Sequence, residues 1–364
     1  MTAIETARRK AEKGERLTLQ DALALYEDND LPALADWARA AKERKSGRQV
    51  FYNVNRHINL TNICTSGCPL CAFQCEEGDA RGYVLETEDI ARILEKAKTV
   101  RNLGEIHIVS ALHPTKDFSY YLQIIRQVKE ALPDVDIKAF TPVEIVHFAQ
   151  LTGRSVREVL SILKEAGLSS LPGGGAEILS DRVRKIICPK KATAAEWIET
   201  MKTAHRLGIR TNATMMYGHV ETIQERIGHL VRIRELQAEK DPGHYGFITF
   251  IPWPFQDKGT VLSEKHGIKS SYTAPDYIRL IAVSRIMLHN IRNIQASLLT
   301  VGRETAIMSL NAGANDLGSI MIEENVVSAA GGGNRYDAES IQSVIREAGF
   351  NPVRRNQKYE PVGS

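Results

Sequence analysis

The sequence predicts an α/β protein, a (β/α)8 barrel of the TIM type that follows a helical extension. Eight apolar runs rich in β-formers recur at about 57–63, 105–112, 136–142, 169–173, 210–217, 246–253, 293–300 and 317–322. Amphipathic stretches with helical spacing separate most of these runs, and glycine often stands just before the next one. Strands that alternate with helices indicate a parallel sheet, and eight of them close a barrel. A doubly wound open sheet is the alternative.

The 364 residues are enough for one large domain with small additions. Apolar residues at helical spacing follow Thr18, a candidate cap, and a second helix is expected over 31–45. We therefore expect a helical extension over residues 1–50 and the barrel over 51–335. A final helix at 338–348 and a polar tail would fill residues 336–364.

Composition excludes several classes of protein. Hydrophobic residues make up 43% and charged residues 25%, as in ordinary globular proteins. A net charge of +3, from 47 basic and 44 acidic residues, does not favour nucleic acid as the main partner. The apolar runs are too short to span a membrane, and no signal region opens the chain. We expect a cytoplasmic monomer or homodimer.

Four of the five cysteines lie between Cys64 and Cys75. Cys64, Cys68 and Cys71 are spaced C-x3-C-x2-C, on a loop that leaves the first barrel strand. Three thiolates can hold a [4Fe–4S] cluster, and they leave one iron open to a ligand that is not protein. A zinc knuckle would need a second Cys/His pair nearby, and disulfides are not expected in a cytosolic chain. We interpret Cys75 as a bystander.

This cysteine spacing after a first barrel strand resembles the radical S-adenosylmethionine superfamily. The resemblance implies that S-adenosylmethionine binds the open iron and is cleaved by one electron to a 5′-deoxyadenosyl radical. It also implies an electron donor such as flavodoxin or ferredoxin. Leu70 stands where the superfamily usually has an aromatic residue, whereas Ala72-Phe73 is typical of the branch with menaquinone and deazaflavin enzymes.

A second signal is the run L-P-G-G-G-A-E-I, residues 171–178. Three successive glycines allow a backbone to approach a ligand closely, and Glu177 can accept hydrogen bonds from a ribose diol. A phosphate loop is less favoured because no G-K-[ST] follows. Together with Glu177, the candidates for binding the cofactor are Phe73, Ser110, Thr141 and Met216. Glu144, close to Thr141, is interpreted as a charge at a helix N-terminus.

Polar residues near the ends of later strands are candidates for catalysis and substrate binding. Asn212, Thr214 and Met216 share one face of the fifth strand, and an inward Asn212 would contact a ligand. His219 and Glu221 follow that strand as candidate acid–base groups. Candidate substrate contacts are His113, Trp253, Asp316 and Glu323, with Asn315 and Glu324 beside them. The structural alternatives are a solvated histidine, an aromatic side chain that closes the barrel, and outward-facing polar residues. Cys188 is interpreted as an inert buried thiol.

Within the superfamily the sequence resembles the enzymes of the futalosine pathway of menaquinone biosynthesis. Residues 50–59, 105–111 and 210–215 resemble aminodeoxyfutalosine synthases, which add the adenosyl radical to an aromatic carboxylate, 3-[(1-carboxyvinyl)oxy]benzoate. Residues 250–255, 294–297 and 318–327 are more similar to cyclic dehypoxanthine futalosine synthases, which abstract a ribose hydrogen and cyclise. The glycine run disfavours the deazaflavin (F0) synthase subunit, where P-G-T-A-A-E is usual.

We therefore expect a radical transferase of the first kind, with the cyclase as the alternative. Two readings from other classes stay open: an iron–sulfur cluster carrier without radical chemistry, and a zinc-dependent barrel hydrolase.

Overall fold

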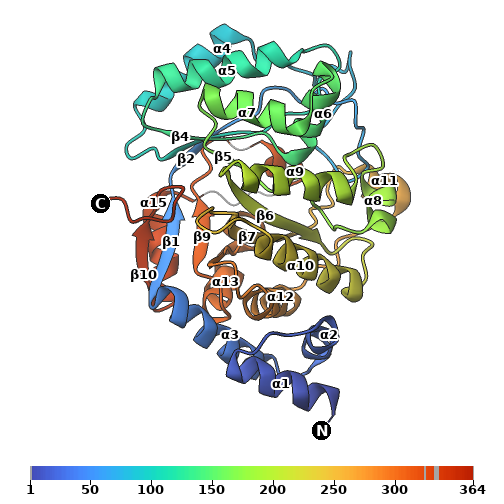
Figure 1. Ribbon diagram of the computed structural model, residues 1–364, viewed down its shortest axis with the longest axis vertical. Helices are drawn as coiled ribbons and strands as arrows, with labels where there is room; N and C mark the ends of the chain where they lie inside the picture. The colour runs from blue at the N-terminus through green and yellow to red at the C-terminus, as the bar shows by residue number, and fades with distance from the viewer. Residues whose placement is uncertain (1, 324, 332–335, 364) are drawn as a thin grey trace.

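The computed structural model describes residues 2–323, 325–331 and 336–363, and it confirms the predicted barrel (Figure 1). Seven parallel strands form one sheet in the order of the chain. These strands are β2 (Asn55–Ile58), β3 (Glu105–Ile108), β4 (Asp136–Ala139), β5 (Ser170–Leu171), β6 (Arg210–Tyr217), β7 (Phe247–Pro254) and β8 (Asn293–Ile294).

Strand β9 (Asp316–Ser319) closes the barrel through isolated bridges rather than a continuous ladder. Gln295, just after β8, bridges Asp316, and Arg56 of β2 bridges Ile322. The His57 N–H also donates to the Ile322 carbonyl at 2.9 Å. The eighth predicted strand therefore lies between β8 and β2.

Fifteen helices are present in the described part of the chain. The N-terminal ones are α1 (Ala3–Lys13), α2 (Leu19–Glu27) and α3 (Leu31–Ser46), and Thr18 caps α2 as predicted. Those that follow are α4 (Thr87–Lys98), α5 (Phe118–Ala131), α6 (Pro142–Thr152), α7 (Val156–Ala166), α8 (Asp181–Ile187), α9 (Ala194–Arg206), α10 (Ile223–Ala238), α11 (Val261–His266), α12 (Ala274–Met287), α13 (Leu298–Asn311), α14 (Val326–Ala329) and α15 (Ala338–Glu347).

The helices cover the outside of the barrel in two groups. Helices α4 to α7 lie over β2–β5, at the top of Figure 1, in one hydrophobic cluster. Helices α9, α10, α12 and α13 share a second cluster with α1–α3, which extends from the middle of the view to its bottom. The boundaries proposed at residues 50 and 335 stay a prediction.

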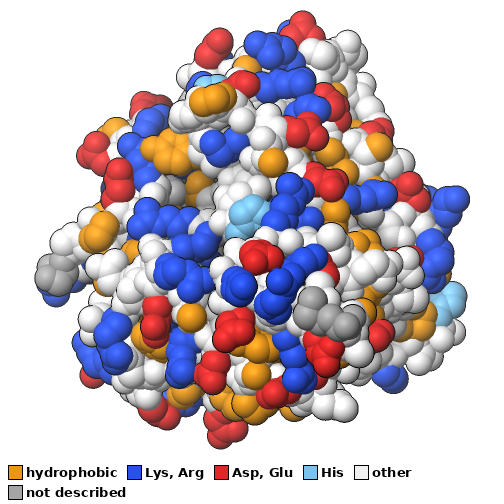
Figure 2. Space-filling view, turned by 60° about the horizontal axis from the view of Figure 1, so that its bottom comes forward, with side chains coloured by type: hydrophobic (Ala, Val, Ile, Leu, Met, Phe, Trp, Pro, Cys, Tyr) orange, Lys and Arg blue, Asp and Glu red, His pale blue; other side chains and the backbone are white. Residues whose placement is uncertain are grey.

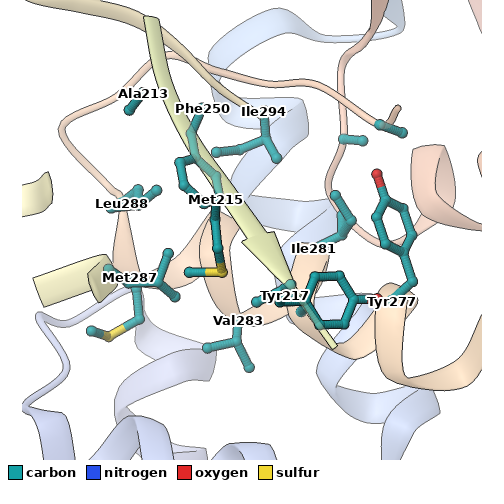
Figure 3. Packing of buried hydrophobic residues seen from close by; sticks show 14 of the residues in the cluster. Ala213, Met215, Tyr217, Phe250, Tyr277, Ile281, Val283, Met287, Leu288 and Ile294 are labelled. Carbon is teal, nitrogen blue, oxygen red and sulfur yellow. The ribbon is translucent and has the colours of Figure 1, made fainter. Parts of the chain in front are cut away.

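The side chains of β6 alternate between the helices and the barrel lumen. On one face of the strand, Ala213, Met215 and Tyr217 pack against residues of α12. Phe250 of β7 belongs to the same hydrophobic cluster (Figure 3). Because successive side chains of a strand point to opposite faces, residues 212, 214 and 216 face the lumen. The inward orientation that the sequence left open is therefore the one observed.

The polar tail differs from the prediction. Residues Asn351–Arg354 form β10, which pairs in parallel with β1 (Gln49–Asn53), and β1 pairs with β9 on its other side. The tail carries no apolar alternation, and its partner strand is about 300 residues away along the chain. Neither β1 nor β10 was predicted.

Basic and acidic side chains are both present over the face shown in Figure 2. No helix in the described residues is both long and apolar enough to cross a bilayer.

Candidate active site

The cysteine loop follows β2 and is held by backbone hydrogen bonds at several points. The Cys64 N–H donates to the Cys75 carbonyl at 3.0 Å, and the Cys75 N–H donates to Asn62 at 2.9 Å. The Leu262 N–H of α11 donates to Pro69 at 2.9 Å, and the Leu70 N–H reaches the Ile187 carbonyl at the end of α8. The loop is thereby fixed at its base and on both sides.

The three predicted cluster ligands are free thiols on this loop. Burial raises the pKa of the Cys68 thiol to about 12, and it also raises the pKa of Cys71. The charge of Lys191 acts in the opposite direction on both, and the N–H groups of Phe73 and Gln74 lower the pKa of Cys71. The Leu112 N–H points at the Cys64 sulfur, 3.4 Å away. N–H groups and a cation beside the sulfurs favour thiolates, the form that binds iron.

Across the described residues, no three His, Cys, Asp or Glu side chains converge on one metal position. A [4Fe–4S] cluster takes each cysteine on a different iron, so three thiols spread around one loop suit a cluster better than a single ion. The residues present therefore fit the cluster. Cys75 lies at the base of the loop, where its backbone pairs with Asn62 and Cys64.

The glycine loop after β5 is packed too tightly for side chains. A Cβ on Gly173 would lie 2.4 Å from the Asn212 carbonyl oxygen, and one on Gly174 would lie 2.8 Å from a Thr141 methyl group. Gly175 has φ +81° and would meet Val143 at 2.4 Å. The loop is held against β6, because Thr214 Oγ1 donates to the Gly173 carbonyl at 2.6 Å.

Glu177 ends this loop in a left-handed conformation, φ +43°, which is uncommon for a residue other than glycine. Its carbonyl accepts the Met216 N–H at 3.0 Å, and its buried carboxylate pairs with Lys191 Nζ at 2.7 Å. Burial alone would raise the pKa of Glu177, but the charge of Lys191 lowers it. Sequence reasoning missed Lys191, which lies 14 residues further along the chain.

Ser110 and Thr141, two predicted cofactor contacts, are joined by Glu144. Thr141 caps α6, and its N–H and hydroxyl donate to Glu144 Oε2 at 2.7 and 2.8 Å. The Ser110 N–H donates to Glu144 Oε1 at 2.9 Å. Burial raises the pKa of Glu144 to about 7 although these donors oppose it. Glu144 is thus more than a charge at a helix N-terminus: it ties the end of β3 to α6.

A layer of polar side chains faces the lumen below the cysteine loop. His57, His107, Lys138 and Ser170 are register partners on β2 to β5, while the alternate residues belong to the outer hydrophobic cluster. The two imidazole centroids are 4.5 Å apart. Burial lowers the pKa of His57 to about 4 and that of His107 well below its usual value, so both rings are neutral at pH 7.

Several buried polar atoms around this layer lack protein partners: Nε2 of His57 and of His107, Ser170 Oγ, Asn59 Oδ1 and Asn212 Oδ1. Native proteins rarely leave such atoms unpaired, and water or a ligand usually satisfies them. The lumen therefore suits a polar small molecule. The period-2 alternation of histidines and isoleucines in β2 and β3 was a signal that could have identified this layer.

His219 and Glu221 are brought together at the end of β6. Glu221 accepts the N–H groups of Gly218 and His219 at 2.7 and 3.0 Å, and Arg226 at 2.6 Å. Burial would raise its pKa, but His219 and Arg226 lower it to about 2. His219 Nε2 donates to the Met216 carbonyl at 3.1 Å, and Nδ1 lies 3.0 Å from Glu221. Both ring nitrogens are therefore engaged within the protein, and a role in proton transfer stays a prediction.

The two remaining candidates near the mouth have different surroundings. His113 is buried, and its Nδ1 accepts the N–H groups of Thr115 and Lys116 at 3.2 and 3.3 Å. Trp253 is half-buried on β7 and is the register partner of Met216. Trp253 thus lies beside Met216 of β6, whose N–H binds the Glu177 carbonyl. His113 instead stabilises the turn that follows β3.

Asp316 and Glu323 are separated from each other. Asp316 is fully buried in β9 and pairs with Arg355 Nε at 2.6 Å, while the half-exposed Glu323 pairs with Arg56 at 2.5 Å. Asn315 accepts a hydrogen bond from Arg285 at 2.7 Å. Glu324 lies outside the described residues. Substrate contact by Asp316 and Glu323 stays a prediction.

Comparison with known proteins agrees with this geometry. Residues 58–233 match the radical SAM superfamily, and residues 244–363 match the CofH/MqnC C-terminal region. The chain is 40% identical to the aminodeoxyfutalosine synthase of Thermus thermophilus over 97% of this chain and 94% of that one. It is 38% identical to that of Streptomyces coelicolor over 96% and 92%. It is also 41% identical, over 95% and 89%, to a 5-amino-6-(D-ribitylamino)uracil–L-tyrosine 4-hydroxyphenyl transferase of Methanosarcina barkeri.

Solved structures share the fold at low identity. Methylornithine synthase superposes with a TM-score of 0.70 at 20% identity, covering 96% of this chain and 97% of the other. The FeFe-hydrogenase maturase HydG of Carboxydothermus hydrogenoformans gives 0.74 at 17% identity, with 98% and 80% covered.

Proposed function

Because this chain belongs to the radical S-adenosylmethionine superfamily, whose enzymes use a [4Fe–4S] cluster and S-adenosylmethionine, we propose that it is an aminodeoxyfutalosine synthase. It would add the 5′-deoxyadenosyl radical to the enol ether of 3-[(1-carboxyvinyl)oxy]benzoate. Rearrangement of the adduct and loss of its carboxylate as carbon dioxide would then give 6-amino-6-deoxyfutalosine for menaquinone biosynthesis. The observation that carries the proposal is the cysteine loop above a layer of buried polar side chains, several of whose atoms have no hydrogen-bond partner. The futalosine-pathway relatives support the choice of substrate.

Cys64, Cys68 and Cys71 would hold the cluster. When bound, the cluster and S-adenosylmethionine supply a 5′-deoxyadenosyl radical after one electron arrives from a donor such as flavodoxin or ferredoxin. The cofactor would lie between the cysteine loop and the glycine loop. Its contacts would be Phe73 of the cysteine loop together with Ser110, Thr141, Glu177 and Met216, which lie at or shortly after the ends of β3 to β6.

The substrate would lie deeper, in the lumen. Neutral His57 and His107 can each donate an N–H to a carboxylate without leaving a buried charge when the substrate departs. The Asn212 side chain faces the same space, and Trp253 would form an aromatic wall beside the benzoate ring. Burial of this layer would keep water from a reactive radical.

His219 and Glu221 would act as positioning residues. Their bonds to Met216, Gly218 and Arg226 fix the end of β6, which carries Met216 to Glu177. Loss of either side chain would misplace the cofactor, and the acid–base role predicted for the two residues is compatible with this position.

A second candidate is transfer of the 4-hydroxyphenyl group of tyrosine. The Methanosarcina transferases are as similar to this chain as the synthases are, and the C-terminal match is to a region named for CofH and MqnC. Ring closure of dehypoxanthine futalosine, suggested by residues 250–255 and 318–327, is the third.

One assay separates these candidates. The protein is reconstituted anaerobically with iron and sulfide and reduced with dithionite, and S-adenosylmethionine is added with each substrate in turn. We expect mass spectrometry to show an adenosylated benzoate adduct only with the carboxyvinyloxy-benzoate. The C68A variant should lose the product, whereas C75A, the matched control in the same loop, should keep it.

Other outcomes redirect the proposal. A hydroxyphenyl adduct formed only with tyrosine and the diaminouracil would replace the synthase by the transferase, and a cyclised product from dehypoxanthine futalosine would replace it by the cyclase. An intact cluster with no cleavage of S-adenosylmethionine would leave only the carrier.

A further inference from the structure

Lys191 is held by a tight turn beside the cysteine loop. The turn follows α8, where the Lys191 N–H donates to the Cys188 carbonyl at 3.1 Å, and Pro189 fixes its second position. The preceding residue, Ile187, accepts the Leu70 N–H of the cysteine loop. The turn and the cysteine loop are therefore in direct contact.

The Lys191 ammonium points away from solvent into the site. It lies 2.7 Å from Glu177 Oε1, and the two side chains are only 19% and 7% exposed. Glu177 and the nearby thiols raise the pKa of Lys191 well above its usual value despite burial, and the charge of Lys191 in turn lowers the pKa of Cys68, Cys71 and Cys188. One cation thus faces both the glycine loop and the cluster ligands.

The neighbouring cation, Arg184, forms hydrogen bonds with backbone carbonyls rather than with Glu177. The buried guanidinium of Arg184 donates to the carbonyls of Gly175 and Ala176 at 2.9 and 2.8 Å and to Ala192 at 3.1 Å. These bonds tie the glycine loop to the Lys191 turn but offer no N–H to Glu177. Within the described part of the chain, Glu177 has no ion-pair partner other than Lys191.

We propose that Lys191 is a positioning residue that orients Glu177 and supplies the positive charge that offsets the cysteine-bound cluster. Three thiolates and a cluster carry net negative charge, and reduction adds one more. A fixed cation in a buried site stabilises the reduced form more than the oxidised form, because electrostatic interactions are strong where water is excluded. Lys191 would therefore raise the reduction potential of the cluster. The inference requires the cluster but not the proposed substrate.

The test measures the potential of the reconstituted protein without any substrate. An EPR-monitored redox titration compares wild type with K191M, K191R and K190M. We expect the ratio of reduced to oxidised cluster at a fixed potential to fall about tenfold in K191M, which is ~59 mV for a one-electron couple. K191R should stay near wild type, and so should K190M, the exposed neighbouring lysine.

A second readout separates this role from a merely structural one. If Lys191 only pairs with a buried carboxylate, the metal-free K191M protein will unfold more easily and E177Q/K191M will recover stability, while the potential stays at the wild-type value. That result would overturn the inference. Should K191M fail to retain iron, K191Q takes its place, since its amide can still donate to Glu177 without charge. An unchanged potential in K191Q would equally refute the inference.

Discussion

At the scale of single residues, Lys42 of α3 is a buried charge without an ion-pair partner in the described structure. Its side chain is inaccessible to solvent, and Nζ lies 3.1 Å from the centroid of the Phe350 ring with no hydrogen bond. Burial lowers its pKa to about 7, and Arg285 adds to the shift. The ring face offers a cation–π contact that offsets part of this cost.

This pKa makes stability depend on pH. In the unfolded chain the amine titrates near 10.4, so between pH 7 and 10 the unfolded state binds more protons and stability rises with pH. We expect K42M to be more stable than wild type by about 2 to 3 kcal/mol at pH 6.5, since each pKa unit is worth ~1.4 kcal/mol and the ring contact offsets some of it. The gap should close towards pH 10. Chemical denaturation across this pH range is the measurement.

The exposed Lys13 of α1 provides the control, because K13M removes a solvated charge. K13M should show no such trend. Parallel pH profiles for wild type and K42M would show that the Lys42 amine is solvated after all.

Residues that act over a few positions could be predicted from the sequence. The spacing of Cys64, Cys68 and Cys71 identifies them as cluster ligands. Thr18 was identified as a cap because the helix starts at the next residue. Lys191 could not be assigned, because a turn after α8 brings it to Glu177. The alternation of histidine with isoleucine could have placed His57 and His107 on one face of their strands, but their pairing with each other depends on strand register. Long-range contacts of this kind leave no trace in local pattern.

At the scale of elements, the glycine loop is fixed by close approach of backbones rather than by flexibility. A methyl group on Gly173 would meet the Asn212 carbonyl of β6, which cannot move without breaking the β6–β7 ladder. We expect G173A to lower the free energy of unfolding by about 2 to 3 kcal/mol, the usual cost of overpacking a core. It should also weaken S-adenosylmethionine binding, because Glu177 ends the same loop. Urea denaturation and calorimetry measure the two effects.

Gly228 gives the matched comparison. It lies inside α10, and a Cβ there meets nothing within 4 Å. G228A should therefore stabilise the protein by roughly 0.5 to 1 kcal/mol, because alanine is the better helix former. Equal effects of G173A and G228A would contradict the packing argument.

The eight barrel strands were predictable because a buried parallel strand is a short apolar run. Their ends were predicted only in part: β6 spans 210–217 as expected, but several other strands are shorter than predicted. Strand β2 stops at Ile58, although the apolar run continues to Ile63, because the chain there turns to pair Ile63 with Cys75. Strand β8 is also shorter than predicted, at two residues, and α13 starts soon after it at Leu298. Loops that build the site compete with the sheet for the same residues.

At the scale of the whole molecule, the C-terminal tail is tied to the barrel wall. Strand β10 extends β1, and the next residue, Arg355, sends its guanidinium to Asp316 of β9 at 2.6 Å. The same guanidinium lies 4.1 Å from the Tyr359 ring, which packs edge-on against Phe51. Three segments that are distant in the sequence, β1, β9 and the C-terminal tail, meet at this buried ion pair, which no sequence pattern predicted.

Removal of one partner tests this closure. We expect R355M to cost about 3 to 5 kcal/mol, because it leaves the Asp316 carboxylate buried and unpaired. D316N/R355M should recover most of the loss, since the amide oxygen can still accept the Gly318 N–H without carrying a charge. Denaturation of both variants, with the exposed R346M of α15 as the control, measures the coupling. Turnover per folded molecule then decides the role of Asp316. If the double variant is stable and fully active, Asp316 holds the barrel closed, whereas a stable but inactive double variant would place its carboxylate on the substrate.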